Sequence, residues 1–377
     1  MIPVTPQSAR ALFKGIRYVL LDVDGVLWNG DHLIAGSPDA VLAMENRMDL
    51  HVRYVTNNAT MSRAGLVAEK FVPRGFVTCD VEKMVSSAYA AALYLRGHGD
   101  AASRPSDREA PSTDPSASPP LGLFDRGNVF VIGNEGLHEE IQQALGPGRF
   151  TYGLELNDAT GYTPSHGAQF LSHRKLPGPR RSASPHSESS PSPACCSVLD
   201  LDIAAVVIGM DYCFNPTKLA VASLCLQKHK LAIDPGHRRS DANRDPCLFV
   251  ATNTDPQIAA GTEGALLPGS GCLVGALVTA VGRQPDAICG KPSTDLLEAL
   301  ELLERAACPP RHLRRDECLM VGDRLTTDIA FAKAGGVRTL FVLSGCETAA
   351  DVAATGIVPD FVAGSLFEAV SCFLTAT

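Results

Sequence analysis

The sequence predicts an α/β protein in which a Rossmann-like, doubly wound parallel sheet forms the core and a second α/β domain is inserted into that core. Two observations predict this fold. Short apolar runs typical of buried parallel strands alternate with amphipathic helical segments along most of the chain. The 377 residues also exceed the ~100–200 residues of an ordinary domain, so two domains are expected.

The composition argues against several classes of protein. Hydrophobic residues make up 45% and charged residues 20% of the chain, as in ordinary globular proteins, and no apolar run approaches the ~20 residues that span a membrane. A net charge of −8 argues against a nucleic-acid partner, because phosphate backbones are bound by dense Lys and Arg patches. Residues 1–15 lack the apolar core of a signal peptide, which predicts a cytoplasmic protein whose twelve cysteines are reduced thiols.

The N-terminal third predicts strand, loop and helix in repeated order. Arg17 to Asp22 is an apolar run that ends in a carboxylate, which is typical of a strand buried on both faces. Ser37 and Pro38 supply the cap and the first-turn proline of a helix. The further expected elements are the end of that helix near Met48, a strand at 51–57, a helix from its cap Ser62 to before Gly75, and an alanine-rich helix at about 82–96.

The middle of the chain forms a second α/β unit that polar stretches interrupt. Strands are expected at 129–132, 203–208 and 248–252, with helices between them. Low-complexity insertions lie near 100–120, 172–197 and 235–246. We interpret these insertions as tolerated surface loops rather than regulatory segments, because added loop length costs little stability.

The last third returns to the alternating pattern of the first. Its expected elements are a helix from Gly271, a strand at 287–289, a helix capped by Ser293, a strand at 318–321, a helix ending at Gly335 and a strand at 338–343. The outer thirds are therefore expected to share one sheet. We place the core at 1–97 and 266–377 and the α/β cap domain at 98–265.

Polar residues follow four of the predicted strands, at or just beyond their carboxyl ends: Asp22, Thr56, Lys291 and Asp323. In open α/β sheets the crevice outside these ends binds ligand, so the four side chains are expected to meet at one site. Asp24 lies two residues after Asp22, and Gly25 allows backbone amides to approach a bound anion closely.

Clustered carboxylates without Cys or His suit a hard cation, and Mg²⁺ fits because it takes few protein ligands together with substrate phosphate. Mg²⁺ and the Lys291 ammonium would then neutralise a phosphoryl group while the Thr56 hydroxyl holds one of its oxygens. Asp22 could attack the phosphorus. Asp24 could protonate the leaving oxygen and later deprotonate a water molecule.

Several of these residues also have simpler interpretations. The stretch from Asp22 to Gly25 is similar to part of an EF-hand calcium loop, but Leu33 occupies the position where that loop needs a glutamate. Asn57 and Asn58 could be turn residues or phosphate contacts; contact is favoured for Asn57, and both remain open for Asn58. Trp28 is expected to pack beside the site.

Four segments resemble the motifs of the haloacid dehalogenase (HAD) superfamily, in the same order. They are Asp22 to Trp28 (DVDGVLW), Val55 to Asn58 (VTNN), Gly290 to Pro292 (GKP) and Val321 to Asp328 (VGDRLTTD). The resemblance implies a large C2-type α/β cap between the second and third motifs. It also implies Mg²⁺ bound by Asp22, Asp323 and the backbone carbonyl of Asp24, with Asp328 supporting the metal shell.

Further segments resemble the subgroup that contains 4-nitrophenylphosphatase, phosphoglycolate phosphatase and pyridoxal phosphate phosphatase. These are VATNTD at 250–255, LPGSG at 267–271 and AVGRQ at 280–284. The resemblance implies hydrolysis of small-molecule phosphate monoesters and a possible homodimer through the cap.

The cap segment 209–218 (GMDYCFNPTK) is similar to the substrate-specificity loop of that subgroup, which predicts substrate contacts from Asp211 and Cys213. Phosphoglycolate and pyridoxal phosphate phosphatases have a histidine where this chain has Cys213. A thiol cannot make the charged or strong hydrogen bonds of an imidazole, so neither compound is assigned as the substrate.

Three alternative functions remain at the level of sequence. A dehalogenase would use Asp22 but would not need Asp24. A phosphomutase of this fold would need Asp24, but the known ones resemble it with a smaller helical cap directly after the first motif. A non-catalytic scaffold protein would not need Asp22, Asp24, Lys291 and Asp323 together.

Overall fold

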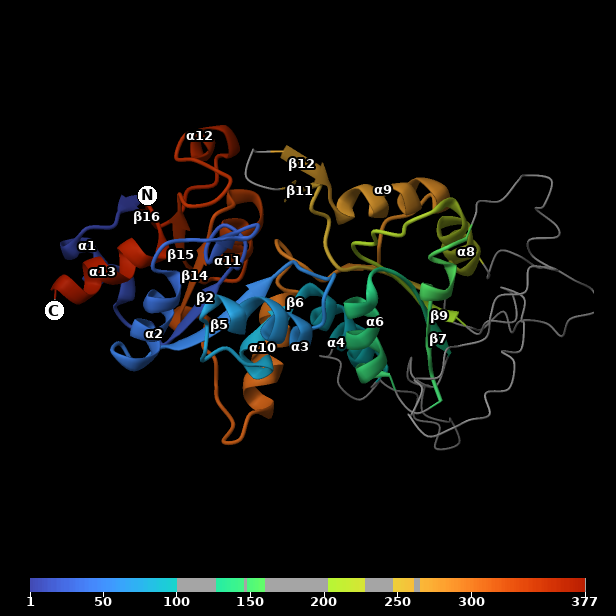
Figure 1. Cartoon of the computed structure of the whole chain (residues 1–377), viewed down its shortest axis with the longest axis horizontal. Coiled ribbons are helices and arrows are strands. Elements are labelled where there is room, and N and C mark those ends of the chain that lie inside the picture. Colours follow the sequence, from blue (N-terminus) through green and yellow to red (C-terminus); the bar gives the residue numbers. More distant parts are fainter. Residues whose placement is uncertain (100–126, 146–147, 160–202, 228–246, 261–264, 377) are drawn as a thin grey trace, which may run out of the picture.

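The computed structural model describes residues 1–99, 127–145, 148–159, 203–227, 247–260 and 265–376 (Figure 1). The three predicted insertions lie outside the described residues. No helix within the described ranges is both long enough and apolar enough to cross a bilayer.

Two parallel sheets organise the chain. The larger has seven strands in the order β1-β16-β15-β14-β2-β5-β6, and every neighbouring pair is parallel. The smaller has five strands in the order β13-β10-β9-β7-β8, again all parallel. The bounds in the larger sheet are β1 Ile2–Pro3, β2 Tyr18–Leu21, β5 His51–Thr56, β6 Met84–Ser86, β14 Cys318–Gly322, β15 Arg338–Val342 and β16 Phe361–Ala363; those in the smaller are β7 Asn128–Ile132, β8 Thr151–Tyr152, β9 Ile203–Ile208, β10 Leu248–Ala251 and β13 Ala287–Ile288.

Helices cover both faces of the larger sheet, which confirms the predicted doubly wound core. The helices α1 (Pro6–Phe13), α2 (Ser37–Asn46) and α13 (Leu366–Ala376) pack on the face to which Val19 and Leu21 point. Leu20 points to the opposite face, which is covered by α4 (Ser87–Gly99), α10 (Asp295–Ala306) and α11 (Ala330–Ala334). Alternate residues of β2 are therefore buried on opposite sides, as expected for a strand inside a parallel sheet.

The smaller sheet forms the cap with helices on both of its faces (Figure 1). The helices α8 (Pro216–Gln227) and α9 (Ser270–Val281) pack on one face. The helix α6 (Glu135–Ala144) packs on the other face and also contacts α4 of the core. One apolar cluster therefore runs from the core sheet through α4 and α6 into the cap sheet.

The strand expected at 287–289 belongs to the cap, contrary to the prediction that it lies in the core sheet. Its two residues pair with Val250 and Ala251 of β10. The physical reason is that the preceding helix, α9, packs on α8 and delivers the chain to the cap sheet. We therefore propose that the second part of the core begins near Gly290 rather than at residue 266.

The segment after β5 departs from a regular helix. Ser62 caps it as expected, because its Oγ accepts a hydrogen bond from the Gly65 amide at 3.3 Å. A short α-helix at Arg63–Leu66 gives way to a π-helical turn, η1 (Val67–Phe71), and a 3₁₀ turn, Val72–Arg74, before Gly75 ends the segment with φ 89°. Phe71, the last residue of η1, is fully buried, so this irregular turn is anchored in the core.

Candidate active site

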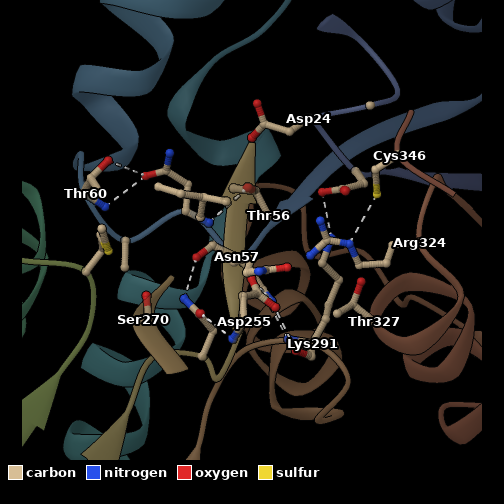
Figure 2. Close-up of a pocket in the computed structure, with 18 of the residues that line it drawn as sticks. Asp24, Thr56, Asn57, Thr60, Asp255, Ser270, Lys291, Arg324, Thr327 and Cys346 are labelled. Atoms are coloured by element: carbon tan, nitrogen blue, oxygen red, sulfur yellow. Dashed lines mark hydrogen bonds and ion pairs between the residues drawn. The ribbon is translucent and has the colours of Figure 1, made fainter. Parts of the chain in front are cut away.

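All four predicted strand-end residues meet in one cavity at the carboxyl edge of the core sheet, and three of them lie at the ends of core strands. Asp22 follows β2, Thr56 ends β5 and Asp323 follows β14, and these three strands are neighbours in the sheet. All three residues line a cavity of about 280 Å³ (Figure 2). Lys291 also lines it, but it arrives on the connection from the cap strand β13 rather than on a core strand.

Lys291 holds two carboxylates together. Its Nζ lies 2.7 Å from Asp22 Oδ1 and 2.6 Å from Asp328 Oδ1, and it donates a hydrogen bond to the carbonyl of Val55 at 3.0 Å. Burial alone would lower the pKa of Lys291, but the charges of Asp22 and Asp328 outweigh burial and raise it. The lysine is therefore a fixed positive charge beneath Asp22.

Asp22, Asp323 and Asp328 form a carboxylate cluster. One oxygen from each lies within 4.8 Å of the others. Burial and the charge of Asp328 raise the pKa of Asp22 well above its usual value, and the same two causes raise the pKa of Asp323 to about 6. Lys291 pairs with two of these three carboxylates, those of Asp22 and Asp328. A site of oxygen ligands with unbalanced negative charge fits a divalent hard cation.

The loop after β2 approaches this cluster closely. Gly25 has φ 85°, a conformation that favours glycine, and a Cβ atom there would overlap the carboxylate of Asp323. A Cβ at Gly345 would overlap the same carboxylate. Glycine is therefore needed at 25 both for backbone conformation and for space.

Asp24 stands apart from Lys291 across the cavity (Figure 2). Its side chain is not a member of the carboxylate cluster; its Oδ1 instead accepts a hydrogen bond from the indole Nε1 of Trp28 at 3.1 Å. Burial raises the pKa of Asp24, although the bond from Trp28 opposes that rise. A carboxyl group with a raised pKa is suited to donating a proton. That the backbone carbonyl of Asp24 binds a metal stays a prediction.

The polar side chains at the end of β5 and in the loop after it mostly form hydrogen bonds within this segment. The Thr56 hydroxyl accepts a hydrogen bond from the Asn58 amide at 3.1 Å. The side-chain oxygen of Asn58 accepts from the amide and the hydroxyl of Thr60, at 2.9 Å and 3.1 Å, so it shapes a turn. Both asparagines line the cavity, but their side-chain oxygens are already engaged within the protein.

The side chain of Asn57, a predicted phosphate contact, forms hydrogen bonds within the protein. Its Oδ1 accepts from the Lys291 amide at 2.8 Å, while its Nδ2 donates to the Lys291 carbonyl at 3.1 Å and to Asp255 at 3.0 Å. Every polar atom of this side chain is therefore used to hold the chain that carries the lysine.

Asp211 and Cys213, the two predicted substrate contacts of the cap, do not line the cavity. Their neighbours Met210 and Tyr212 line it instead. The carboxylate of Asp211 points into the cap, where it lies 2.6 Å from the Nζ of the fully buried Lys218 and accepts from the Cys213 amide at 2.8 Å. The ion pair with Lys218 therefore keeps the carboxylate of Asp211 out of the cavity lining.

Two family models match the chain: a haloacid dehalogenase-like hydrolase model over residues 19–145, and a HAD-hydrolase-like model over residues 288–369. Phosphoglycolate phosphatase 1A, chloroplastic, from Arabidopsis thaliana is 29% identical over 367 residues, which cover 97% of this chain and 79% of that protein. Chronophin from Rattus norvegicus is 31% identical over 333 residues, which cover 88% and 77%. The chain belongs to the haloacid dehalogenase-like hydrolases.

A solved relative repeats the fold along most of the chain. Glycerol phosphate phosphatase from Mycobacterium tuberculosis is 25% identical, and its complex with calcium superposes with a TM-score of 0.60 over 95% of this chain and 76% of that one. Its complex with magnesium gives 0.59, over 95% and 78%. Within its family this chain is a phosphoric monoester hydrolase, so the scaffold and dehalogenase alternatives fall away.

Asp255, Arg324 and Cys346 are among the residues of this HAD phosphatase that line the cavity and were not predicted as site residues. The Cys346 amide donates to Asp323 at 2.8 Å, and the Arg324 Nε lies 3.4 Å from the Cys346 sulfur. Asp255 and Arg324 follow the strands β10 and β14, so their position just beyond apolar runs was the available signal. Cys346 follows β15 by several residues, and no sequence signal pointed to it.

Changing Trp28 to Phe is expected to lower kcat about tenfold, because the lost indole N–H leaves Asp24 without its donor. The smaller ring still packs edge-on against Phe71 and Phe76, where the present centroid distances are 4.8 Å and 5.8 Å. The pH at which the acid–base group titrates should also rise, since that hydrogen bond opposes the effect of burial on the pKa of Asp24.

Steady-state rates measured across pH test this prediction. Phe76→Leu is the matched control, since it disturbs the packing of the indole but leaves its N–H in place. An unchanged kcat in Trp28→Phe, or an equal fall in both variants, would contradict the positioning role.

Proposed function

We propose that this phosphatase hydrolyses small-molecule phosphate monoesters with a bound Mg²⁺ and through a phosphoryl group carried on Asp22. The observation that carries the proposal is the environment of Asp22. Its carboxylate belongs to a buried cluster with one lysine, while the carboxyl group of Asp24, which is not part of that cluster, faces the same cavity.

Asp22, Asp323 and Asp328, with the backbone carbonyl of Asp24, would hold the metal. The oxygen donor set and the deficit of positive charge support a divalent cation, and the relative from M. tuberculosis was solved with magnesium and with calcium. When bound, Mg²⁺ supplies Lewis-acid neutralisation of the phosphoryl oxygens.

The chain's own residues account for the two chemical steps. In the first, an Asp22 oxygen forms a bond to phosphorus, the bond from phosphorus to the ester oxygen breaks, and Asp24 gives its proton to that oxygen. In the second, water attacks the phosphorus of the aspartyl phosphate, Asp24 takes the proton of the water, and Asp22 leaves as a carboxylate. Inorganic phosphate and an alcohol are the products.

Lys291 and Thr56 would stabilise the transferring group. The ammonium of Lys291 is fixed by two carboxylates and cannot swing away, so its charge is organised before the substrate arrives. The Thr56 hydroxyl, at the end of β5, would bind a phosphoryl oxygen. The phosphomutase alternative falls away with the assignment as a phosphoric monoester hydrolase.

The test is hydrolysis of 4-nitrophenyl phosphate by chelator-treated protein titrated with Mg²⁺. We expect no turnover without metal, saturable recovery with Mg²⁺, and a rise in melting temperature over the same concentration range. Full activity in the presence of chelator would refute the metal requirement. A panel with phosphoglycolate, pyridoxal phosphate, glycerol phosphate and nucleotides then identifies the substrate class.

Two wider expectations accompany this function. A homodimer through the cap and a cytoplasmic location stay predictions, since neither follows from the geometry of the site. Light scattering of the purified chain tests the first, and fractionation of cells that express it tests the second.

A further inference from the structure

A second chamber adjoins the catalytic cavity on the side of Asp24. It has a volume of about 490 Å³ and shares Asp24, Thr56, Asn58, Thr60 and Tyr212 with the catalytic cavity. Asp22 does not line it. Under the proposed function Asp24 protonates the leaving oxygen, so the alcohol part of the substrate must lie on this side.

The chamber has an apolar wall on one part of its lining and one cationic side chain among its described lining residues. Val23, Trp28, Leu66 and Phe71 supply the apolar wall. Lys70 supplies the charge, from the π-helical turn η1 that Phe71 anchors in the core. The apolar wall makes an ionic contact in this chamber stronger than the same contact in open water.

The charge of Lys70 is not neutralised by a neighbour within the described part of the chain, where its ammonium makes no ion pair. Asp31 also lines the chamber, but its carboxylate lies 3.2 Å from Arg74 Nη2 and is already paired. Burial raises the pKa of Asp24, and Lys70 is among the groups that oppose this rise, which places the ammonium within electrostatic reach of the acid–base carboxyl group.

We propose that this chamber binds the leaving group and that Lys70 selects phosphate esters whose alcohol part carries a second anionic group such as a carboxylate. Lys70 is thus a specificity-determining residue of the site described above. The inference rests on the proposed function, since it needs Asp24 to face the leaving oxygen. It assigns the substrate class that Asp211 and Cys213 leave open.

Two matched pairs of esters test the proposal. 3-Phosphoglycerate and glycerol 3-phosphate differ by a carboxylate in place of a hydroxymethyl group, and 2-phosphoglycolate and 2-hydroxyethyl phosphate differ in the same way. We expect Lys70→Met to lower kcat/KM about tenfold for the carboxylate member of at least one pair and less than twofold for its neutral member. A tenfold change in kcat/KM is small for the loss of a hydrogen bond to a charged group. We expect this small effect because Lys70 is half-buried, so that water partly screens its charge.

Two further variants separate charge from structure. Lys70→Arg keeps the charge and should retain the preference for the carboxylate member. Lys333→Met removes an exposed lysine of α11, away from both cavities, and should leave all four rates unchanged.

The outcomes distinguish this inference from the proposed function. If the wild-type enzyme hydrolyses none of the four esters or 4-nitrophenyl phosphate, the proposed function fails and takes the inference with it. If it hydrolyses them but Lys70→Met lowers both members of each pair equally, only the inference is overturned. An equal loss would mark Lys70 as a residue that supports the fold of η1.

Discussion

Asp22→Asn is expected to lower kcat for 4-nitrophenyl phosphate by about four orders of magnitude or more, because an amide cannot form the phosphoryl-enzyme bond. The thermal stability of the folded state should not fall. Asp22 is one of two carboxylates that pair with Lys291, and the other, Asp328, whose Oδ1 lies 2.6 Å from the Lys291 Nζ, remains as its partner. We therefore expect a melting temperature in chelator that equals or exceeds that of the wild type.

The measurement pairs single-turnover kinetics with thermal unfolding in chelator. Asp316→Asn is the matched control, since Asp316 is an exposed aspartate near the other end of β14. Turnover by Asp22→Asn at the wild-type rate would exclude Asp22 as the nucleophile. A large loss of stability would instead give the inactivity a structural cause.

Lys291→Met is expected to abolish turnover and, unlike Asp22→Asn, to destabilise the protein by about 3–5 kcal/mol in chelator. The side chain of Lys291 is 2% exposed, and its removal leaves Asp22 and Asp328 without the buried cation that pairs with both. Mg²⁺ should restore part of the lost stability, because it supplies positive charge to the same oxygens.

The pH dependence of Lys291→Met has a defined sign. Lys291 lowers the pKa of Asp22 against the effects of burial and of the Asp328 charge, so removing the lysine raises that pKa further. The folded variant therefore binds protons more tightly than the folded wild type, and its stability deficit should shrink as the pH falls. Denaturant unfolding at several pH values, with Lys333→Met as control, measures this. A deficit independent of pH and of Mg²⁺ would contradict the electrostatic explanation.

The chemistry of the site was predictable because it depends on topology. Each apolar strand followed by a polar residue brings that residue to one edge of the parallel sheet, and Asp22, Thr56 and Asp323 meet there. The family and fold predictions are confirmed by the relatives. The strand β6 was missed inside an expected helix, since three residues are too few to show a period of two.

The contacts that were not predicted depend on side-chain orientation. Sequence spacing could not tell that Asn57 faces the Lys291 backbone, or that Asp211 turns towards Lys218. For Asn57 the orientation is decided by a partner far along the chain, since Asn57 and Lys291 are 234 positions apart. Terminal elements such as β1 and β16 also gain their partners only in the folded sheet.

Because β13 pairs with the cap sheet, the cap and the catalytic core of this enzyme are not independent units. Lys291 comes three residues after β13, and Asn57 clasps its backbone at the point where the chain passes from cap to core. A movement of the cap would therefore act on the short connection that leads to Lys291, while the core carboxylates hold the ammonium itself. A cap exchanged for that of another phosphatase would carry the lysine's tether with it, so changes of specificity and changes of catalytic rate are mechanically linked in this chain.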